Sequence, residues 1–218
     1  MDWNAAARVR SVGIGALAFV AAGGTAEAET QPLSAHFKKR NVLAGGRVPV
    51  TGMLLTHQAG RKVLLQAANG HGWHTVARTK TGGNGSFRIA FKPRALGSYR
   101  LRVRLVGAAA SSAPGTHVSA KQQRGRVRVY RPTNASWYGP GLYGGRTACG
   151  GTLDSTTLGV ANRTLPCGTK VTFHYRGRTV TAKVIDRGPF VGGREWDLTP
   201  ATRSKLGFGS TGTVWSTR

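Results

Sequence analysis

Short runs in which apolar and polar residues alternate are the feature that most restricts how this 218-residue chain can fold. In Ser86–Phe91, for example, every second residue is apolar. A period of two is typical of strands with one buried face, and 32 glycines supply turns between them. One short segment instead has helix signals, with Thr199 as N-cap, Pro200 in the first turn and Gly207 as the stop. We therefore expect an all-β protein with one short helix.

The alternating runs fall into two groups. Residues 31–131 contain six or seven runs within about 100 residues, which is typical of an immunoglobulin-like β-sandwich. Leucine, valine, isoleucine and phenylalanine would lie inside this sandwich, with arginine on its solvent face. A stretch at 107–123 lacks any period and predicts a long loop. Beyond a very short linker at 132–133, residues 135–218 predict a second, barrel-like β unit that carries the helix.

The N-terminus has the pattern of an export signal. Arg8 and Arg10 precede an apolar stretch at 12–22, and an A-x-A motif ends at Ala28. We expect a signal peptide over residues 1–28 and a mature chain that is secreted or held in the cell envelope. The apolar stretch is too short to span a bilayer comfortably, so no transmembrane anchor is expected after cleavage, although an uncleaved anchor is the alternative.

Charge is very unevenly distributed along the chain. Between Thr30 and Asn134 there are 19 basic residues and no acidic one. The positive electrostatic field of so many basic residues without acidic neighbours attracts polyanions. For an exported protein we expect anionic wall polymers as partners of the basic sandwich and expect no nucleic acid. An arginine-rich composition without a dedicated partner would give the same total charge.

The chain has two cysteines, Cys149 and Cys167. In an exported protein they predict one disulfide, and two buried free thiols are the alternative. No histidine stands at a zinc-ligand spacing from either cysteine, so no metal site is expected. No pattern for an organic cofactor is visible either.

Four motifs follow one another in the second unit. They are Ala135–Gly141 with Gly144–Ala148, Ala161–Thr169, Asp186–Phe190, and Asp197–Thr199 with Leu206–Gly207. In this order they resemble the RlpA-like family, which includes septal lytic transglycosylases and the related expansins. The resemblance covers residues 135–218 and implies a six-stranded double-psi β-barrel that acts on peptidoglycan glycan strands.

The resemblance also implies which acids are catalytic. Asp186 matches the groove aspartate of the family, and Asp197 matches a second groove acid of expansin-like proteins. A lytic transglycosylase needs one carboxyl group as general acid and then as base, because the sugar's own 6-hydroxyl is the nucleophile. We expect Asp186 in that role, with Asp197 close enough to favour its protonated form. The alternative role for Asp186 is to accept turn N–H bonds at a strand end.

Further residues would bind the glycan. Flat aromatic rings suit the apolar faces of sugars, and we expect Tyr138 and Trp196 to face the groove. Asp154, which matches another family acid, and Arg187 complete the expected substrate-binding set.

The chain departs from the enzyme pattern at two positions. Gly151 stands where RlpA-type enzymes carry a glutamate, and Asn162 stands where they carry a histidine. These departures favour a second hypothesis, a non-catalytic expansin-like module that binds or loosens wall polysaccharide. A third hypothesis is an exported polyanion binder with a merely structural barrel. In each case a monomer is expected.

Overall fold

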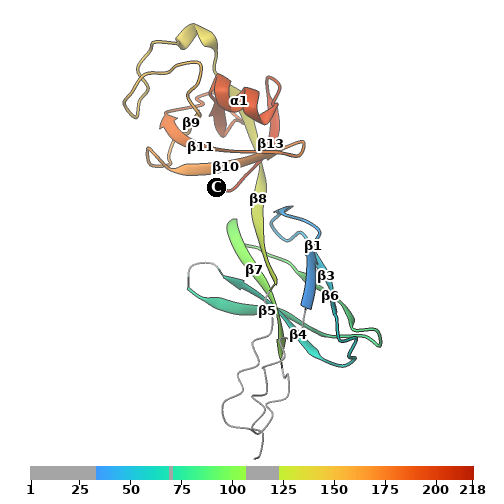
Figure 1. Cartoon of the computed structure of the whole chain (residues 1–218). Coiled ribbons are helices and arrows are strands. Elements are labelled where there is room, and N and C mark those ends of the chain that lie inside the picture. Colours follow the sequence, from blue (N-terminus) through green and yellow to red (C-terminus); the bar gives the residue numbers. More distant parts are fainter. Residues whose placement is uncertain (1–32, 69–70, 107–122) are drawn as a thin grey trace, which may run out of the picture.

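The computed structural model describes residues 33–68, 71–106 and 123–218. The predicted signal peptide at 1–28 lies outside the described residues, as does nearly all of the predicted loop at 107–123. Two β units follow each other along the described chain (Figure 1). None of the helices in these described ranges is long and apolar enough to cross a membrane.

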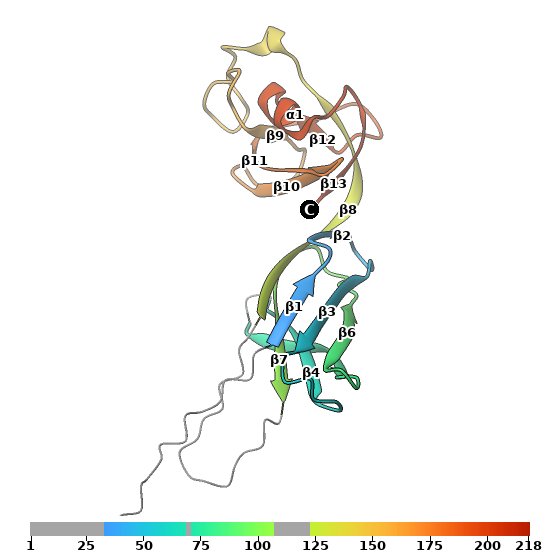
Figure 2. The same ribbon diagram turned by 45° about the vertical axis from the view of Figure 1, so that its right-hand side comes forward.

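The first unit is a sandwich of two sheets. One sheet has the order β1–β3–β6, and Figure 2 shows these strands side by side in one layer (Leu33–Phe37, Val48–Leu54 and Ser86–Phe91). The other has the order β5–β4–β7–β8, with β2 beside β8 (Trp73–Lys80, Lys62–Ala68, Gly97–Val106, Gln123–Trp137 and Asn41–Leu43). Alternate residues of both sheets, such as Val50 and Val103, are fully buried between them. The prediction of a β-sandwich is confirmed.

The second unit is a closed barrel of six strands. The ring runs β8–β13–β10–β11–β9–β12 and returns to β8, with β12–β8 and β11–β9 parallel and the other pairs antiparallel. The new strands are β9 Gly159–Ala161, β10 Lys170–Tyr175, β11 Arg178–Asp186, β12 Trp196–Leu198 and β13 Gly212–Ser216. Closure leaves no free sheet edge and encloses a core that includes Val171, Phe173 and Val214.

One helix and one 3₁₀ turn complete the barrel. Helix α1 (Pro200–Leu206) begins after Thr199, whose side chain accepts a hydrogen bond from the Thr202 N–H, and ends at Gly207 with a φ of 66°. Both cap predictions are confirmed. The 3₁₀ turn η1 (Pro140–Leu142) follows β8.

Strand β8 belongs to both units. It pairs with β7 in the sandwich and with β13 and β12 in the barrel, so the expected linker at 132–133 is in fact part of this strand. The change in composition after residue 133 does not mark a break in the strand, because Pro132 and Thr133 pair with Trp215 and Val214 inside the ladder. Tyr130 is fully buried in β8, donates a hydrogen bond to Asn41 of the sandwich and contacts His174 of the barrel.

Candidate functional site

A β-bulge sets the orientation of Asp186, the last residue of β11. Val184 of this strand pairs with Val160 of β9, but the next pair joins Asp186 to Ala161, so Ile185 is an extra residue. Val184 points into the core, and regular alternation would turn Asp186 inward as well. The bulge turns it outward instead, which is a common role of bulges near functional sites.

Asp197 lies on the same outer face of the barrel. Asp197 belongs to β12, which pairs with β9 on the side away from β11, and its pairing partner is again Ala161. The neighbours of Asp197 in the strand, Trp196 and Leu198, are fully buried. Residues opposite one another on neighbouring strands present their side chains on the same face of the sheet. Asp186 and Asp197 therefore flank Ala161 on one face of the sheet.

Each carboxylate has defined hydrogen-bond donors. Asp186 Oδ1 accepts from the backbone N–H groups of Ala148 and Arg187, both at 2.9 Å. Among the described residues no protein group donates to Asp186 Oδ2. Asp197 Oδ1 accepts from Ser136 Oγ at 2.6 Å. Asp186 thus has the strand-end hydrogen bonds of a structural aspartate and, in addition, a second oxygen that is available for chemistry.

Tyr138 links the two acids. Its hydroxyl is buried and has no hydrogen-bond partner among the described residues. Burial raises the pKa of Tyr138 well above 10, and the negative charges of Asp186 and Asp197 raise it further. Both carboxylates therefore act on this hydroxyl, which remains protonated and can donate a hydrogen bond to a partner such as a sugar oxygen or a carboxylate.

A cavity of about 260 Å³ opens beside Asp186 and Tyr138. Leu142 and Tyr143 line it and are 56% and 41% exposed. Tyr143 also lines a neighbouring cavity of about 490 Å³, where the Arg203 guanidinium lies 4.2 Å from the centre of the Trp137 ring. The two cavities share Tyr143, so apolar rings and polar groups extend along the surface on one side of Asp186.

Trp196 does not face this surface. It is fully buried in the barrel core, where its ring packs edge-on against Phe173 with centroids 5.2 Å apart. The expectation that it faces a groove is wrong, because Asp197 points outward and its neighbours along the strand must then point inward. The exposed aromatic rings of the motif segments are Tyr143 and Phe190, the latter 81% exposed.

Asp154 lies in an exposed turn beside Leu153, which lines the cavity, and is not itself among the lining residues. Hydrogen bonds from the Thr156 hydroxyl and then from Thr157 lower the pKa of Asp154. Its Oδ1 accepts both the N–H and the hydroxyl of Thr156 at 2.7 Å. The structure therefore gives Asp154 a local turn-forming role and does not bring it together with Asp186 and Asp197.

Arg187 holds the backbone next to the site in place. Its guanidinium donates to the backbone oxygens of Asn162 and Leu165 at 3.1 and 3.0 Å, and to Cys167 Sγ at 3.2 Å. Cys167 forms the predicted disulfide with Cys149. The disulfide holds the segment that contains Ala148, the N–H donor to Asp186. Arg187 and the disulfide thus position Asp186 through backbone that they fix.

The two departures from the enzyme pattern have clear local reasons. Gly151 has a φ of +83°, a conformation that strongly favours glycine, and a Cβ added there would meet nothing within 4 Å. Asn162 is buried, accepts from the N–H groups of Thr164 and Leu165, and donates to the Glu195 oxygen. Neither position supplies an acid or an imidazole to the cavity. Across the described ranges, no three His, Cys, Asp or Glu residues are grouped so as to hold a metal ion.

Several contributors to this site were not expected from the sequence. They are the bulge at Ile185, the Ser136 hydroxyl, the Ala148 N–H and the cavity-lining Leu142 and Tyr143. Only Tyr143 carried a sequence signal, since it is an aromatic residue between the two stretches of the first motif.

The closed ring of six mixed strands, with two aspartates on its outer face, defines the second unit as a double-psi β-barrel. A family model described as lytic transglycolase matches residues 131–215, so this unit belongs to the RlpA-like double-psi β-barrel family.

Two relatives and one solved structure are similar to parts of this chain. The probable endolytic peptidoglycan transglycosylase RlpA of Synechocystis is 48% identical over 80 residues, which cover 36% of this chain and 25% of the relative. The endolytic peptidoglycan transglycosylase RlpA of Campylobacter jejuni is 37% identical over 115 residues, which cover 47% and 42%. The Streptomyces papain inhibitor covers 41% of this chain and 94% of its own, with 26% identity and a TM-score of 0.32. This chain therefore spans less than half the length of these two curated relatives.

Proposed function

We propose that this chain is an exported protein of the cell envelope that cleaves peptidoglycan glycan strands as a lytic transglycosylase. The observation that supports this most is that Asp186 and Tyr138 line one open cavity, while Asp197 lies on the same face of the barrel and acts electrostatically on the Tyr138 hydroxyl. The names of the RlpA relatives supply the substrate class.

The reaction uses Asp186 twice. A proton on Asp186 Oδ2 passes to the glycosidic oxygen, and the bonding pair of the C1–O bond leaves with that oxygen. The 6-hydroxyl of the same sugar then attacks C1, and its proton returns to Asp186. The product is a 1,6-anhydro sugar end, and no water is consumed.

The neighbouring groups assist this step. Ser136 holds the Asp197 carboxyl group in place by a hydrogen bond, so that it can stabilise the positive charge that develops at C1. Tyr138 donates a hydrogen bond from its hydroxyl to a sugar oxygen or to a carboxylate. The exposed rings of Tyr143 and Phe190 offer apolar faces to the sugar rings.

Product analysis tests this function. Glycan strands, with and without stem peptides, are incubated with the purified chain, and 1,6-anhydro ends are measured by mass spectrometry. We expect such ends with the wild type and none with Asp186→Asn. Glu195→Gln is the matched control, because Glu195 is an acid of the same barrel that pairs with Arg131 outside this cavity. Equal product from wild type and Asp186→Asn would refute the role of Asp186.

A second function, non-catalytic glycan binding of the expansin type, is favoured by Gly151 and Asn162, which leave the cavity without the extra acid and imidazole. Co-sedimentation with glycan strands that yields no anhydro ends would support this function. In either case we propose that the mature chain is a secreted or envelope-held monomer and that the basic sandwich binds anionic wall polymers.

A further inference from the structure

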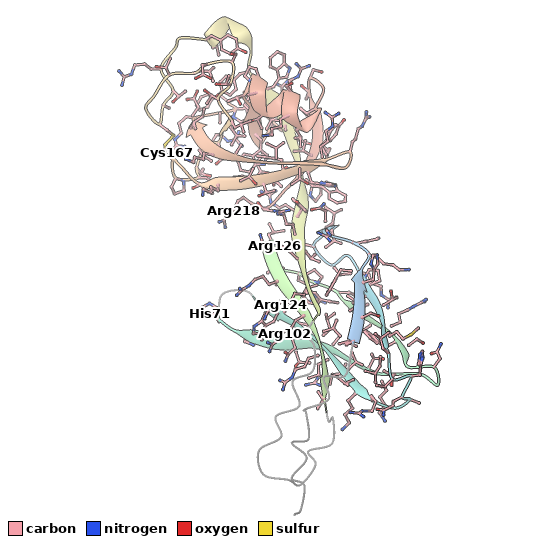
Figure 3. All side chains as sticks on the ribbon, viewed as in Figure 1. His71, Arg102, Arg124, Arg126, Cys167 and Arg218 are labelled. Carbon is pink, nitrogen blue, oxygen red and sulfur yellow. A yellow bond between two sulfur atoms is a disulfide. The ribbon has the colours of Figure 1, made fainter. Side chains whose placement is uncertain are left out.

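One face of the sandwich is lined with cationic side chains. In β7 and β8 the apolar residues, such as Val103 and Val127, point into the core, and the residues between them point outward. The outward positions of these two strands, together with those of β4 and β5, form what we call the basic face. It consists of Lys62, Arg78, Lys80, Arg100, Arg102, Arg104, Arg124, Arg126 and Arg128. Arg102, Arg124 and Arg126 are labelled in Figure 3.

Several of these charges lie directly opposite one another. The register pairs Arg100 with Arg126 and Arg102 with Arg124. Like charges at opposite positions of neighbouring strands destabilise a sheet. The sequence contains no Asp or Glu between residues 30 and 153, so the sandwich has no carboxylate of its own to offset this repulsion.

Arg102 lies at the centre of the basic face. Its Nε donates to Gln66 Oε1 at 2.8 Å, and its guanidinium lies 4.2 Å from the centre of the Trp73 ring. Burial, followed by the charges of Arg104 and Arg124, lowers the pKa of Arg102. The side chain is therefore held in place within a concentrated positive field, which a bound anion would relieve.

We propose that the basic face binds a linear phosphodiester polymer of the cell wall, with a polyol-phosphate backbone. Seven of its nine cationic residues are arginine, whose planar guanidinium matches phosphate oxygens in a two-point geometry that lysine lacks. Alternate residues of a strand are about 6.7 Å apart, and neighbouring strands about 4.8 Å, so the guanidinium groups form a regular array. A flexible chain of phosphates can follow such rows.

Single-stranded nucleic acid fits this face less well. Proteins that bind single strands provide open aromatic rings on which the bases stack. The aromatic ring of the basic face is that of Trp73, and the guanidinium of Arg102 already covers it, with Arg100 at 5.8 Å. The face therefore supplies sites for phosphate without a platform for bases.

The choice of a wall polymer as the source of these phosphates rests on the proposed function of the barrel. Because β8 carries both the basic face and one wall of the barrel ring, a polymer bound to the sandwich would keep the Asp186 cavity close to the wall. The preference for phosphate follows from the sandwich alone.

A binding experiment on the full chain tests the proposal. The probe is poly(glycerol phosphate) free of peptidoglycan, titrated at 50 to 300 mM NaCl. The test variant replaces Arg100, Arg102, Arg124 and Arg126 with glutamine. The control variant replaces Lys38, Arg88, Lys92 and Arg94 with glutamine. These four residues are exposed outside the basic face, so the control variant loses the same number of positive charges as the test variant.

We expect the dissociation constant of the test variant at 0.1 M salt to rise about 100-fold, and that of the control less than about fivefold, because each phosphate contact contributes separately to the salt-dependent affinity. The test variant should melt no lower than the wild type, since repulsion is relieved. Equal effects of the two variants would overturn the proposal. So would binding of polygalacturonate or oligo(dT) of equal charge that is as tight as that of the polyol phosphate.

The result of this polymer-binding experiment can be separated from the result of the cleavage assay on the barrel. On glycan strands that lack the polymer, the test variant should release as many anhydro ends as the wild type. Loss of polymer binding with cleavage intact would support the face and the barrel independently. Absence of cleavage from the wild type, with polymer binding present, would refute only the proposed function.

Discussion

Replacing Tyr138 with phenylalanine should separate the stability of the barrel from its function. The Tyr138 hydroxyl is buried without a partner among the described residues and lies near two carboxylates. A buried hydroxyl without a partner destabilises a fold by about 1–3 kcal/mol. Removing it keeps the ring and its packing, so we expect Tyr138→Phe to raise the free energy of unfolding by about 1 kcal/mol. For a domain of this size that corresponds to an increase in Tm of about 4–8 °C.

The pH dependence of this effect has a defined sign. Burial raises the pKa of Tyr138 in the folded chain above its ordinary value of 10.0. Above that pH the unfolded chain releases the proton and the folded chain retains it, so the wild type loses stability as the pH rises. Phenylalanine has no such proton. The stability advantage of Tyr138→Phe should therefore grow above pH 10.

Function should change in the opposite direction. Loss of one hydrogen bond to the glycan, or to a carboxylate that acts on it, should weaken cleavage or binding about tenfold. Thermal and urea unfolding at pH 7 and pH 10.5, with anhydro-end release or glycan co-sedimentation, measure both effects. Tyr143→Phe, on an exposed ring of the same cavity, is the control and should leave stability unchanged. A less stable Tyr138→Phe, or one with wild-type function, would refute the role given to this hydroxyl.

Three further changes test the supports of the site. Deleting Ile185 removes the bulge and turns Asp186 toward the core. The free energy of unfolding, measured in urea, should then fall by more than about 3 kcal/mol, and a near-neutral deletion would contradict the register. Replacing Cys149 and Cys167 together with serine opens an 18-residue separation and should destabilise by about 3 kcal/mol under oxidising conditions, with no difference from wild type once both are reduced. Thr199→Ala removes the N-cap and two further hydrogen bonds of this hydroxyl, so urea unfolding should show a loss of about 2 kcal/mol, and a loss below about 0.5 kcal/mol would argue against the cap.

The longer elements of the fold were predictable because their side chains follow one period. Ser86–Phe91 forms β6 at the predicted bounds, and the Thr199 and Gly207 caps enclose the predicted helix. The strands β9 and β12 were not predicted, since three residues are too few to show alternation. Their formation depends on pairing within the closed ring rather than on local sequence.

The site was predictable as a set of acids but not as a geometry. Motif resemblance indicated Asp186 and Asp197, but the sequence Val184-Ile185-Asp186 has no feature that reveals the bulge. The error at Trp196 was avoidable, because an outward Asp197 requires inward neighbours in a strand. Asn162 shows a different limit, since its side chain joins its own loop, through Thr164 and Leu165, to the backbone of Glu195, which is far away in sequence.

The central claim is that the glycan binds beside Asp186, Asp197 and Tyr138, and an NMR titration tests it most directly. The ¹⁵N-labelled full chain would be titrated with a soluble glycan fragment of peptidoglycan, using Asp186→Asn if the wild type cleaves it. The account predicts that the largest amide shifts fall at Tyr138, Tyr143, Ala148 and Asp186. Shifts confined to the separate cavity around Arg131 and Glu195, or to the sandwich, would contradict it.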